Sequence, residues 1–531
     1  MKNQNETPFG SPRFLAALAI TFLSLWGWQY YLNKKYPPQT ATKAATTSAP
    51  ATQAVGADAT GASSDTTAAT ANTAAMASGV ETKTLSYADE KVSFSVSSVG
   101  MGFSAYEIKD YKDNKGQNIQ FTNAKPLFGL YHNGQPVLFS LSQKSATEFV
   151  GEATLDGKKI VRTLTYDPKT HAIRSAVQFD AGLEKLDFQA QQNKLIITST
   201  NFLMPSFEHQ DFIFVQEGKT HAETISGIKE GEGFIKTSAG VSMASISSQY
   251  FTAAIVNKSD FLPSLNKKVE GHNANIFFEY DLKNIKANTI DNIVYIGAKK
   301  TEILAGIDPL FEEVMNYGMF GFISKPLLKL LKFMYDLLGN WGFAIIGMTI
   351  IVRAILLPFN VISFRSAQAM QRIKPQMDAV REKYKNDPMR LNKETMALMK
   401  DNNANPVSGC LPMLIQIPIF FALWRAISGS VELYQQPFFG WIHDLSQHDP
   451  YFVLPILMGL TMYLQQKMTP TTMDPTQQKI LNFMPIMFTL FMVTLPSGLT
   501  LYNFVSALFG VTQQFFLLKS NKSNTAALKP A

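Results

Sequence analysis

The sequence predicts a polytopic α-helical membrane protein with six transmembrane helices, five of them forming a C-terminal core, and a large external all-β sandwich domain. Three observations predict this class. Six stretches are apolar and long enough to approach a bilayer span, and a long middle region alternates between apolar and polar residues. In addition, 46% of the 531 residues are hydrophobic and only 17% are charged.

Composition also excludes some functions. The net charge of +7 comes from the predicted membrane part and its flanks, so the chain carries no basic surface specific for nucleic acid. The single cysteine, Cys410, excludes an internal disulfide framework and any multi-cysteine zinc site, and the histidines lack metal-ligand spacing. The sequence therefore predicts no metal and no cofactor.

Residues 1–36 are predicted to form a signal anchor that is not cleaved. Phe14–Leu32 contains 19 uncharged residues, close to the roughly 20 that a membrane helix needs, and no small-residue cleavage motif closes it. Residues 37–84 are mostly Ala and Thr. Because such a segment cannot bury a core, we expect a disordered tether.

Residues 85–306 are predicted to form the β sandwich. Val92–Val96 and Ile160–Tyr166 alternate with period two, and Leu195–Thr198 reads as a further strand. The pairs Asn133-Gly134 and Asp156-Gly157 predict tight hairpins, because both residues of such a turn need positive φ.

Residues 307–340 are predicted to lie at the membrane interface. Pro326–Leu338 reads as an amphipathic helix, in which Lys329, Lys332 and Asp336 form a narrow polar stripe. A mostly apolar helix of this kind beside a membrane span is expected to lie in the interface plane.

Residues 341–518 contain the predicted five-helix core. Its spans are Trp341–Ile362, Cys410–Val431, Tyr451–Gln466, Ile480–Leu495 and Leu499–Leu518. The third and fourth have about 16 residues, or ~24 Å of helix, which is less than the ~30 Å of a hydrocarbon core. We expect them to thin the bilayer locally.

Loop charge predicts the topology. The loop at residues 363–409 carries nine basic side chains and the loop at 432–450 carries none. The positive-inside rule then places the first loop, the N-terminus and the 519–531 tail in the cytoplasm, with the β domain outside.

The 363–409 loop is predicted to be a helical hairpin that turns at Asn386-Asp387-Pro388. Two interpretations of it stay open. It is either a solvated pair of charged helices resting on lipid, or a docking surface for a nascent chain, its targeting machinery or the ribosome. The basic side chains that would dock are Arg372, Lys374, Arg381, Lys383 and Lys385.

Arg353 is the residue that points to a function. It stands without a carboxylate in an apolar span, where an arginine costs ~3 kcal/mol or more and usually faces a wet cavity. Thr349, Gln416, Tyr502 and Asn503 are polar residues of the same core that could line a hydrophilic groove with it.

Purely structural explanations of these polar residues also stay open. Arg353 could snorkel to the headgroups, and each polar companion could simply make an interhelical hydrogen bond. Arg425, beside Trp424, is expected to snorkel to the outer interface. No nucleotide-binding, nucleophile-elbow or zinc-protease motif occurs in the spans, so no catalytic residue is predicted.

Four segments carry a resemblance to a known family. They are NPVSGCLPMLIQIPIF at 405–420, PTTMDPTQQKI at 470–480, PSGLTLY at 496–502, and Val352-Arg353. Together with the order of the domains, they resemble the YidC membrane protein insertase family, in its Gram-negative form with a large periplasmic domain.

The resemblance implies an insertase and chaperone for nascent inner-membrane proteins, acting alone or with the Sec translocon. It implies that the groove at Arg353 opens to the cytoplasm and to lipid, and that an apolar substrate segment slides along Ile417, Phe420 and Phe491. Ribosome, signal-recognition machinery and lipids are the further partners that it implies. Asn503, where better-known members tend to have a second tyrosine, and Arg425, in place of an uncharged residue, depart from the pattern.

Two other functions stay open. A solute transporter or channel with an external binding domain would use Arg353 to recognise an anion, but no internal repeat is visible in the five core spans. A tethered sugar-processing enzyme would need two facing carboxylates in the β domain, which a sequence cannot place in space.

Overall fold

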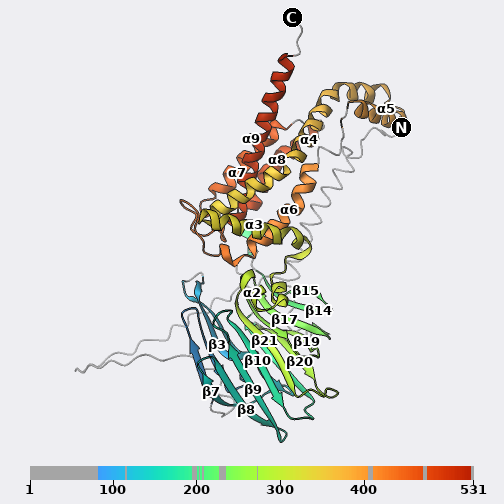
Figure 1. Ribbon diagram of the computed structural model, residues 1–531. Coiled ribbons are helices and arrows are strands. Elements are labelled where there is room, and N and C mark those ends of the chain that lie inside the picture. Colours follow the sequence, from blue (N-terminus) through green and yellow to red (C-terminus); the bar gives the residue numbers. More distant parts are fainter. Residues whose placement is uncertain are drawn as a thin grey trace, which may run out of the picture. The chain divides into compact units, whose positions relative to one another are not determined.

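The structure is a computed structural model, shown as a ribbon in Figure 1. It describes residues 82–113, 116–193, 200–201, 204–205, 209–225, 235–271, 273–402, 404, 411–469 and 475–527. These residues all belong to one compact unit, Thr82–Ala531. The predicted anchor Phe14–Leu32, the predicted strand Leu195–Thr198 and Cys410 lie outside the described residues.

The first part of the described chain is built of β strands. They are β1 (Thr84–Ala88), β2 (Val92–Ser97), β3 (Phe103–Lys112), β4 (Asn118–Leu127), β5 (Gly129–His132), β6 (Gln135–Pro136), β7 (Ser140–Ser145), β8 (Glu148–Leu155), β9 (Lys158–Tyr166), β10 (Ala172–Phe179), β11 (Lys185–Asn193), β12 (Thr200–Asn201), β13 (Met204–Pro205), β14 (Gln210–Gln216), β15 (Lys219–Thr224), β16 (Ile235–Ser238), β17 (Val241–Ser248), β18 (Phe251–Asn257), β19 (Ser264–Glu270), β20 (Asn273–Asp281) and β21 (Thr289–Ala298).

Two large sheets dominate this domain. One has nine strands in the order β15-β14-β17-β18-β21-β10-β9-β8-β7, and the other has six in the order β16-β19-β20-β11-β5-β6. Neighbouring strands run antiparallel. Phe188 and Phe278 of the six-stranded sheet share one buried cluster with Ile255 and Val294 of the nine-stranded sheet. The expected β sandwich is therefore present.

Turn chemistry explains the two predicted hairpins. Asn133 and Gly134 have φ of 49° and 77° between β5 and β6, and Asp156 and Gly157 have φ of 50° and 76° between β8 and β9. Asn, Asp and Gly tolerate this left-handed backbone, and such turns match the twist of the strands that they join. Both hairpins are confirmed.

Helices make up the rest of the described chain. They are α2 (Thr301–Ile307), η2 (Pro309–Met315), η3 (Gly318–Phe320), α3 (Gly321–Leu338), α4 (Trp341–Lys383), α5 (Pro388–Asp401), α6 (Leu411–Ser428), η5 (Val431–Leu433), α7 (Val453–Met468), α8 (Pro475–Met492) and α9 (Ser497–Ala527). Helix α3 begins at Gly321, five residues before the predicted start, so Pro326 lies inside the helix and its ring removes one backbone hydrogen bond there.

Helix α4 continues from the membrane core into the hairpin. Its N-terminus is capped by Asn340, whose side chain accepts hydrogen bonds from the backbone N–H groups of Gly342 and Phe343 at 2.8 and 3.2 Å. Its far end packs against α5 through a small apolar cluster that contains Met370 and Ile373. The hairpin is therefore a packed pair of helices rather than two separate arms.

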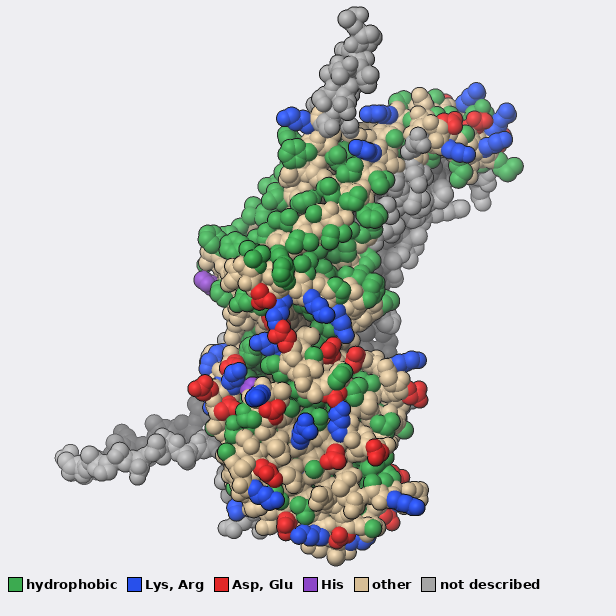
Figure 2. Space-filling model, viewed as in Figure 1, with side chains coloured by type: hydrophobic (Ala, Val, Ile, Leu, Met, Phe, Trp, Pro, Cys, Tyr) green, Lys and Arg blue, Asp and Glu red, His purple; other side chains and the backbone are tan. Residues whose placement is uncertain are grey.

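The six predicted membrane spans are matched only in part by the described helices. Within the described residues, two helices are long and apolar enough to cross a membrane, Trp341–Lys383 and Ser497–Lys519, while Ile415–Ser428 and Asn482–Met492 are shorter apolar helices. Figure 2 shows hydrophobic side chains spread over the surface of the helical part, and charged side chains spread over the β domain. An apolar outer surface of this kind suits contact with lipid.

Candidate functional site

Arg353 lies on α4 beside a cavity of about 120 Å³ within the helical core. Its Nε atom is buried and has no hydrogen-bond partner among the residues that the structure describes. The cavity is lined by Arg353, Asn360, Ser363, Phe364, Ala367, Gln465, Thr469, Gly510, Gln513, Gln514 and Leu517. None of these side chains is acidic, so the cavity holds one positive charge among neutral polar groups.

Three helices place these side chains together. Arg353, Asn360 and Ala367 recur every seven residues, which puts them on one face of α4. Gly510, Gln513, Gln514 and Leu517 share one face of α9 in the same way, and α7 contributes its end. The cavity therefore depends on how α4, α7 and α9 pack.

The amides in the cavity are incompletely paired. Gln514 Nε2 donates a hydrogen bond of 3.1 Å to Thr469 Oγ1, whereas Gln514 Oε1 is buried without a partner in the described part of the chain. Gln466 Oε1, which is next to Gln465 in sequence but does not line the cavity, is also buried and unpaired within the described residues. Unpaired buried polar atoms are costly unless they meet water or a ligand, so this part of the core suits a polar guest.

Two of the predicted groove residues form a link beside Arg353. Gln416 Nε2 of α6 donates to Tyr502 Oη of α9 at 3.4 Å, and Tyr502 is fully buried. The Tyr502 side chain is close enough to Arg353 to interact with it electrostatically. The structure thus links Gln416 to Tyr502 and Tyr502 to Arg353, but neither Gln416 nor Tyr502 lines the cavity.

The other two predicted groove residues bond to their own helices. Thr349 is fully buried, and its hydroxyl donates to the carbonyl of Ile345 at 2.6 Å. Asn503 Nδ2 donates to the carbonyl of Leu499 at 2.9 Å. Neither residue lines the cavity at Arg353.

Sequence reasoning missed Asn360, Ser363, Gln465 and Thr469 as cavity residues. The spacing of seven residues between Arg353 and Asn360 is a signal that could have found the first of them. Gln465 and Thr469 carry no such signal, because only the packing of α7 against α9 brings them there.

The predicted substrate slide lies on an apolar surface of α6 and α8. Ile417 and Phe491 are 41% and 38% exposed, and Phe420 is half-buried. The ring of Phe420 lies 6.3 Å from that of Phe488, and the ring of Trp424 lies 6.1 Å from that of Phe491. Aromatic side chains therefore join the two helices along this surface.

The predicted docking residues lie on the hairpin of α4 and α5. Arg372, Arg381, Lys383 and Lys385 are exposed and Lys374 is half-buried. Figure 2 shows Lys and Arg side chains gathered at this end of the helical part. The hairpin therefore presents a basic surface.

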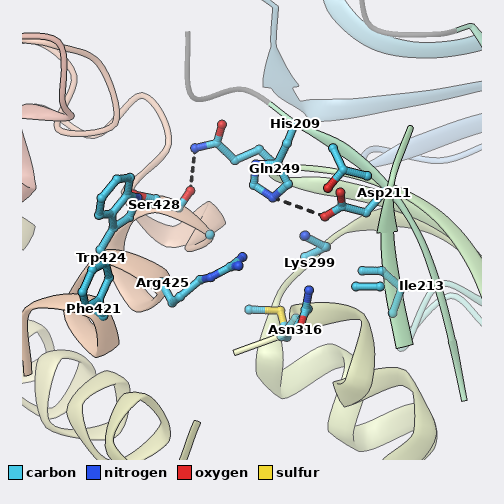
Figure 3. A pocket seen from close by; sticks show the side chains of 14 residues that line it. His209, Asp211, Ile213, Gln249, Lys299, Asn316, Phe421, Trp424, Arg425 and Ser428 are labelled. Carbon is cyan, nitrogen blue, oxygen red and sulfur yellow. Dashed lines mark hydrogen bonds and ion pairs between the residues drawn. The ribbon is translucent and has the colours of Figure 1, made fainter. Parts of the chain in front are cut away.

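Arg425 lines a different cavity, of about 430 Å³, between α6 and the β domain. The sequence suggested only that it would reach the outer interface. It faces Lys299, which follows β21, and no sequence signal connects these two residues (Figure 3).

Comparisons with known sequence families match both parts of the chain. A family described as "60Kd inner membrane protein" matches residues 333–524, and one described as "YidC periplasmic domain" matches residues 90–330. The residues matched by the first family include Arg353 and its cavity, and those matched by the second include most of the β sandwich. The helical part thus resembles an inner-membrane protein family, and the β domain resembles a periplasmic domain family.

Individual relatives agree with these matches. A membrane protein insertase YidC of Campylobacter jejuni is 40% identical over 69% of this chain and 66% of its own length. One of Oleidesulfovibrio alaskensis is 33% identical over 75% of this chain and 78% of its own length. This chain therefore aligns with just under two thirds of the length of the Campylobacter jejuni protein and with more than two thirds of the length of the Oleidesulfovibrio alaskensis protein.

A solved structure titled "Active YidC insertase crystal structure with the first transmembrane domain resolved" has a TM-score of 0.36 and 17% identity, covering 82% of this chain and 92% of that chain. The sequence relatives are much closer, and one of them aligns over more than three quarters of its length. The sequence relatives alone therefore show that the chain belongs to the YidC membrane protein insertase family.

Proposed function

We propose that this chain inserts and folds nascent membrane proteins in the inner membrane, and that the cavity at Arg353 receives the polar part of the substrate. The observation that supports this most directly is the buried Nε of Arg353, unpaired within the described residues and bordered by amide and hydroxyl side chains. A charged group inside a membrane core is costly, and it usually marks a pathway or a binding site.

Desolvation is the barrier that such a cavity lowers. A polar segment that enters ~30 Å of hydrocarbon loses its hydrogen bonds to water. The guanidinium of Arg353 and the amides of Gln465, Gln513 and Gln514 offer replacement donors and acceptors part of the way across. The positive charge favours a segment that carries carboxylates.

The substrate's own apolar segment supplies the driving force. Burial of apolar surface in lipid is favourable by about 25 cal/mol per Å², so partition of a whole helix needs no nucleotide and no covalent step. The exposed apolar surface of α6 and α8, with Ile417, Phe420 and Phe491, offers a path on which this segment moves into lipid.

Short helices shorten the path further. Helix α7 has 16 residues and α8 has 18. At 1.5 Å per residue, α7 is ~24 Å long, less than the ~30 Å of hydrocarbon. We propose six spans in all, including Phe14–Leu32, with both termini in the cytoplasm and a bilayer that is thinned around α7 and α8.

The basic hairpin suits a docking role at the cytoplasmic end. Its exposed side chains Arg372, Arg381 and Lys383 can attract the acidic surface of a ribosome, a targeting factor or a nascent chain. The proposal includes action beside the Sec translocon as well as alone. The proposal requires neither the ribosome nor the Sec translocon for a polar segment to enter the cavity at Arg353.

Reconstitution tests the proposal. The purified protein is placed in liposomes with a short single-span substrate, and protease protection of the translocated tail is scored for the wild type, Arg353→Ala and Arg353→Lys. We expect the wild type and Arg353→Lys to protect the tail and Arg353→Ala to lose most of the protection, because the cavity needs a charge rather than a bidentate fork.

Arg365→Ala is the matched control, since Arg365 is an exposed arginine on the same helix and lies outside the cavity. Full protection of the substrate tail by Arg353→Ala would contradict the role of the cavity, but it would not contradict the insertase function. Absence of protection with the wild type, in the presence of a substrate known to insert in cells, would contradict autonomous insertion.

A further inference from the structure

The larger cavity, of about 430 Å³, combines charged and aromatic walls (Figure 3). The β domain contributes His209, just before β14, Asp211 of β14, and Lys299, which follows β21. Helix α6 contributes aromatic side chains and Arg425. This cavity is separate from the one at Arg353, and insertion as proposed above does not require it.

Lys299 is an unusual cation for such a place. It is only 4% exposed, and its side chain has no hydrogen bond or ion pair within the part of the chain that the structure describes. The one carboxylate that lines the cavity is Asp211, whose Oδ2 lies 3.6 Å from His209 Nε2 and whose Oδ1 is buried without a hydrogen-bond partner among the described residues. A buried, unpaired ammonium is strongly unfavourable unless an anion joins it.

The titration of Lys299 agrees with this geometry. Burial lowers the pKa of Lys299 to about 8, while Asp211 acts in the opposite direction and Arg425 adds to the lowering. The side chain therefore still carries its charge at neutral pH. An anion in the cavity would raise the pKa again.

Arg425 brings a second positive charge to the same space. Its guanidinium extends from α6 toward Lys299, with Asn316 beside it (Figure 3). Among the described residues Arg425 has no ion-pair partner, and its charge opposes that of Lys299. The cavity is therefore lined by two cations, Lys299 and Arg425, and by one carboxylate, Asp211. The excess of positive charge suits an anion.

The wall on the α6 side is aromatic and partly exposed. Phe421 is 45% exposed, and its ring stacks on that of Trp424 at 6.3 Å with an angle of 12°. Phe421 also stacks on Phe320, which precedes α3. A tryptophan beside a cation at the end of a membrane helix is typical of the level of the lipid headgroups.

We propose that this cavity binds the phosphate group of a phospholipid of the periplasmic leaflet, between Lys299 and Arg425, with the acyl chains along Phe421 and Trp424. The cavity volume is large enough for a headgroup. A soluble phosphate would use the two cations but not the aromatic wall, and an acidic peptide has no acyl chain to lie along it. A bound lipid would connect the periplasmic domain to the membrane.

Lipid retention by the full-length protein tests this proposal. The protein is delipidated in a non-ionic detergent and titrated with dioctanoylphosphatidylglycerol, and native mass spectrometry reports the first bound lipid. We expect the double variant Lys299→Met/Arg425→Gln to weaken this first binding event by about tenfold or more, because it removes both positive charges that would contact the phosphate. The single variant Lys299→Arg is expected to bind the lipid as tightly as the wild type, because it keeps the charge.

Lys300→Met is the matched control, because Lys300 is the next residue along the chain and does not line the cavity. The proposal would be overturned if the double variant bound the lipid as tightly as the wild type while circular dichroism showed that both proteins are folded. Displacement of the lipid by inorganic phosphate at equal concentration would also overturn it, because it would identify a soluble ligand. Displacement by an acidic peptide without acyl chains would overturn it in favour of a substrate site.

Discussion

Gln249 donates a hydrogen bond of 2.7 Å through its Nε2 atom to the backbone carbonyl of Ser428. Gln249 lies between β17 and β18, and Ser428 is the last residue of α6. The bond is buried and joins the β domain to the helical core, at the edge of the cavity that holds Lys299 and Arg425.

We expect Gln249→Leu to weaken this junction. The substitution leaves the Ser428 carbonyl buried without its donor, which costs about 1–3 kcal/mol. Thermal unfolding in detergent should show the loss, and hydrogen exchange should rise at the end of α6. Gln216→Leu is the control, because Gln216 makes a bond of 2.7 Å to the Ala239 carbonyl on the exposed surface. An equal effect of both variants would contradict a special role of the junction.

Lys299→Met should stabilise the delipidated protein. The folded-state pKa of Lys299 is about 8 and the usual value is 10.5. Between these values the unfolded chain binds more protons than the folded chain, so the stability of the wild type rises from pH 8 to pH 10.5. Below pH 8 the wild type bears the full cost of burying the charged Lys299 side chain, which is of the order of 3 kcal/mol.

The free energy of unfolding of the variant should therefore exceed that of the wild type most at pH 7, and this difference should shrink above pH 10. Chemical unfolding at both pH values measures it. Added phospholipid should reduce the difference at pH 7, since the proposed ligand neutralises Lys299. A variant that is less stable than the wild type at pH 7 without lipid would show that Lys299 has a partner in the folded protein.

Gly510→Ala should change the cavity at Arg353 with little loss of stability. A Cβ atom at Gly510 would lie 2.6 Å from Gln465 Nε2, so the flexible end of Gln465 must move. Both residues line the cavity. We expect reduced protection of a translocated tail in the liposome assay and unfolding at nearly the wild-type temperature. Unchanged protection would mean that Gln465 contributes nothing to the proposed path.

Asp449 should be essential for the start of α7. It is 1% exposed and accepts hydrogen bonds from Trp441 Nε1 at 2.9 Å, from the Tyr451 N–H at 3.1 Å and from the Leu454 N–H at 2.7 Å. Asp449→Ala leaves three donors unpaired and should cost about 3 kcal/mol or more. Thermal unfolding in detergent measures this cost.

Asp449→Asn is the matched comparison, because the amide keeps one acceptor oxygen and should lose less. Equal losses for the two variants would indicate that the negative charge, rather than the number of hydrogen bonds, holds this loop.

Local patterns were sufficient wherever a short segment decides its own structure. The hairpins at Asn133-Gly134 and Asp156-Gly157 follow from the φ angles that these residue types tolerate. The cost of a lone arginine in an apolar span points to Arg353 without any knowledge of its neighbours.

The same patterns were insufficient where a side chain can choose between partners. Helical spacing places Thr349 one turn from Arg353, yet its hydroxyl bonds to the Ile345 carbonyl. A buried threonine in a helix often makes this bond, because its own backbone is the nearest acceptor. Spacing alone does not distinguish the two choices.

Local patterns were enough to predict the class of protein, the β sandwich, the apolar helices and the position of a lone arginine in an apolar span. They did not predict which residues share a cavity: Gln465 and Thr469 with Arg353, and Lys299 with Arg425. These residues are far apart along the chain. Periodicity acts within one helix or strand, whereas these neighbours meet through the packing of separate elements, whose arrangement no local pattern specifies.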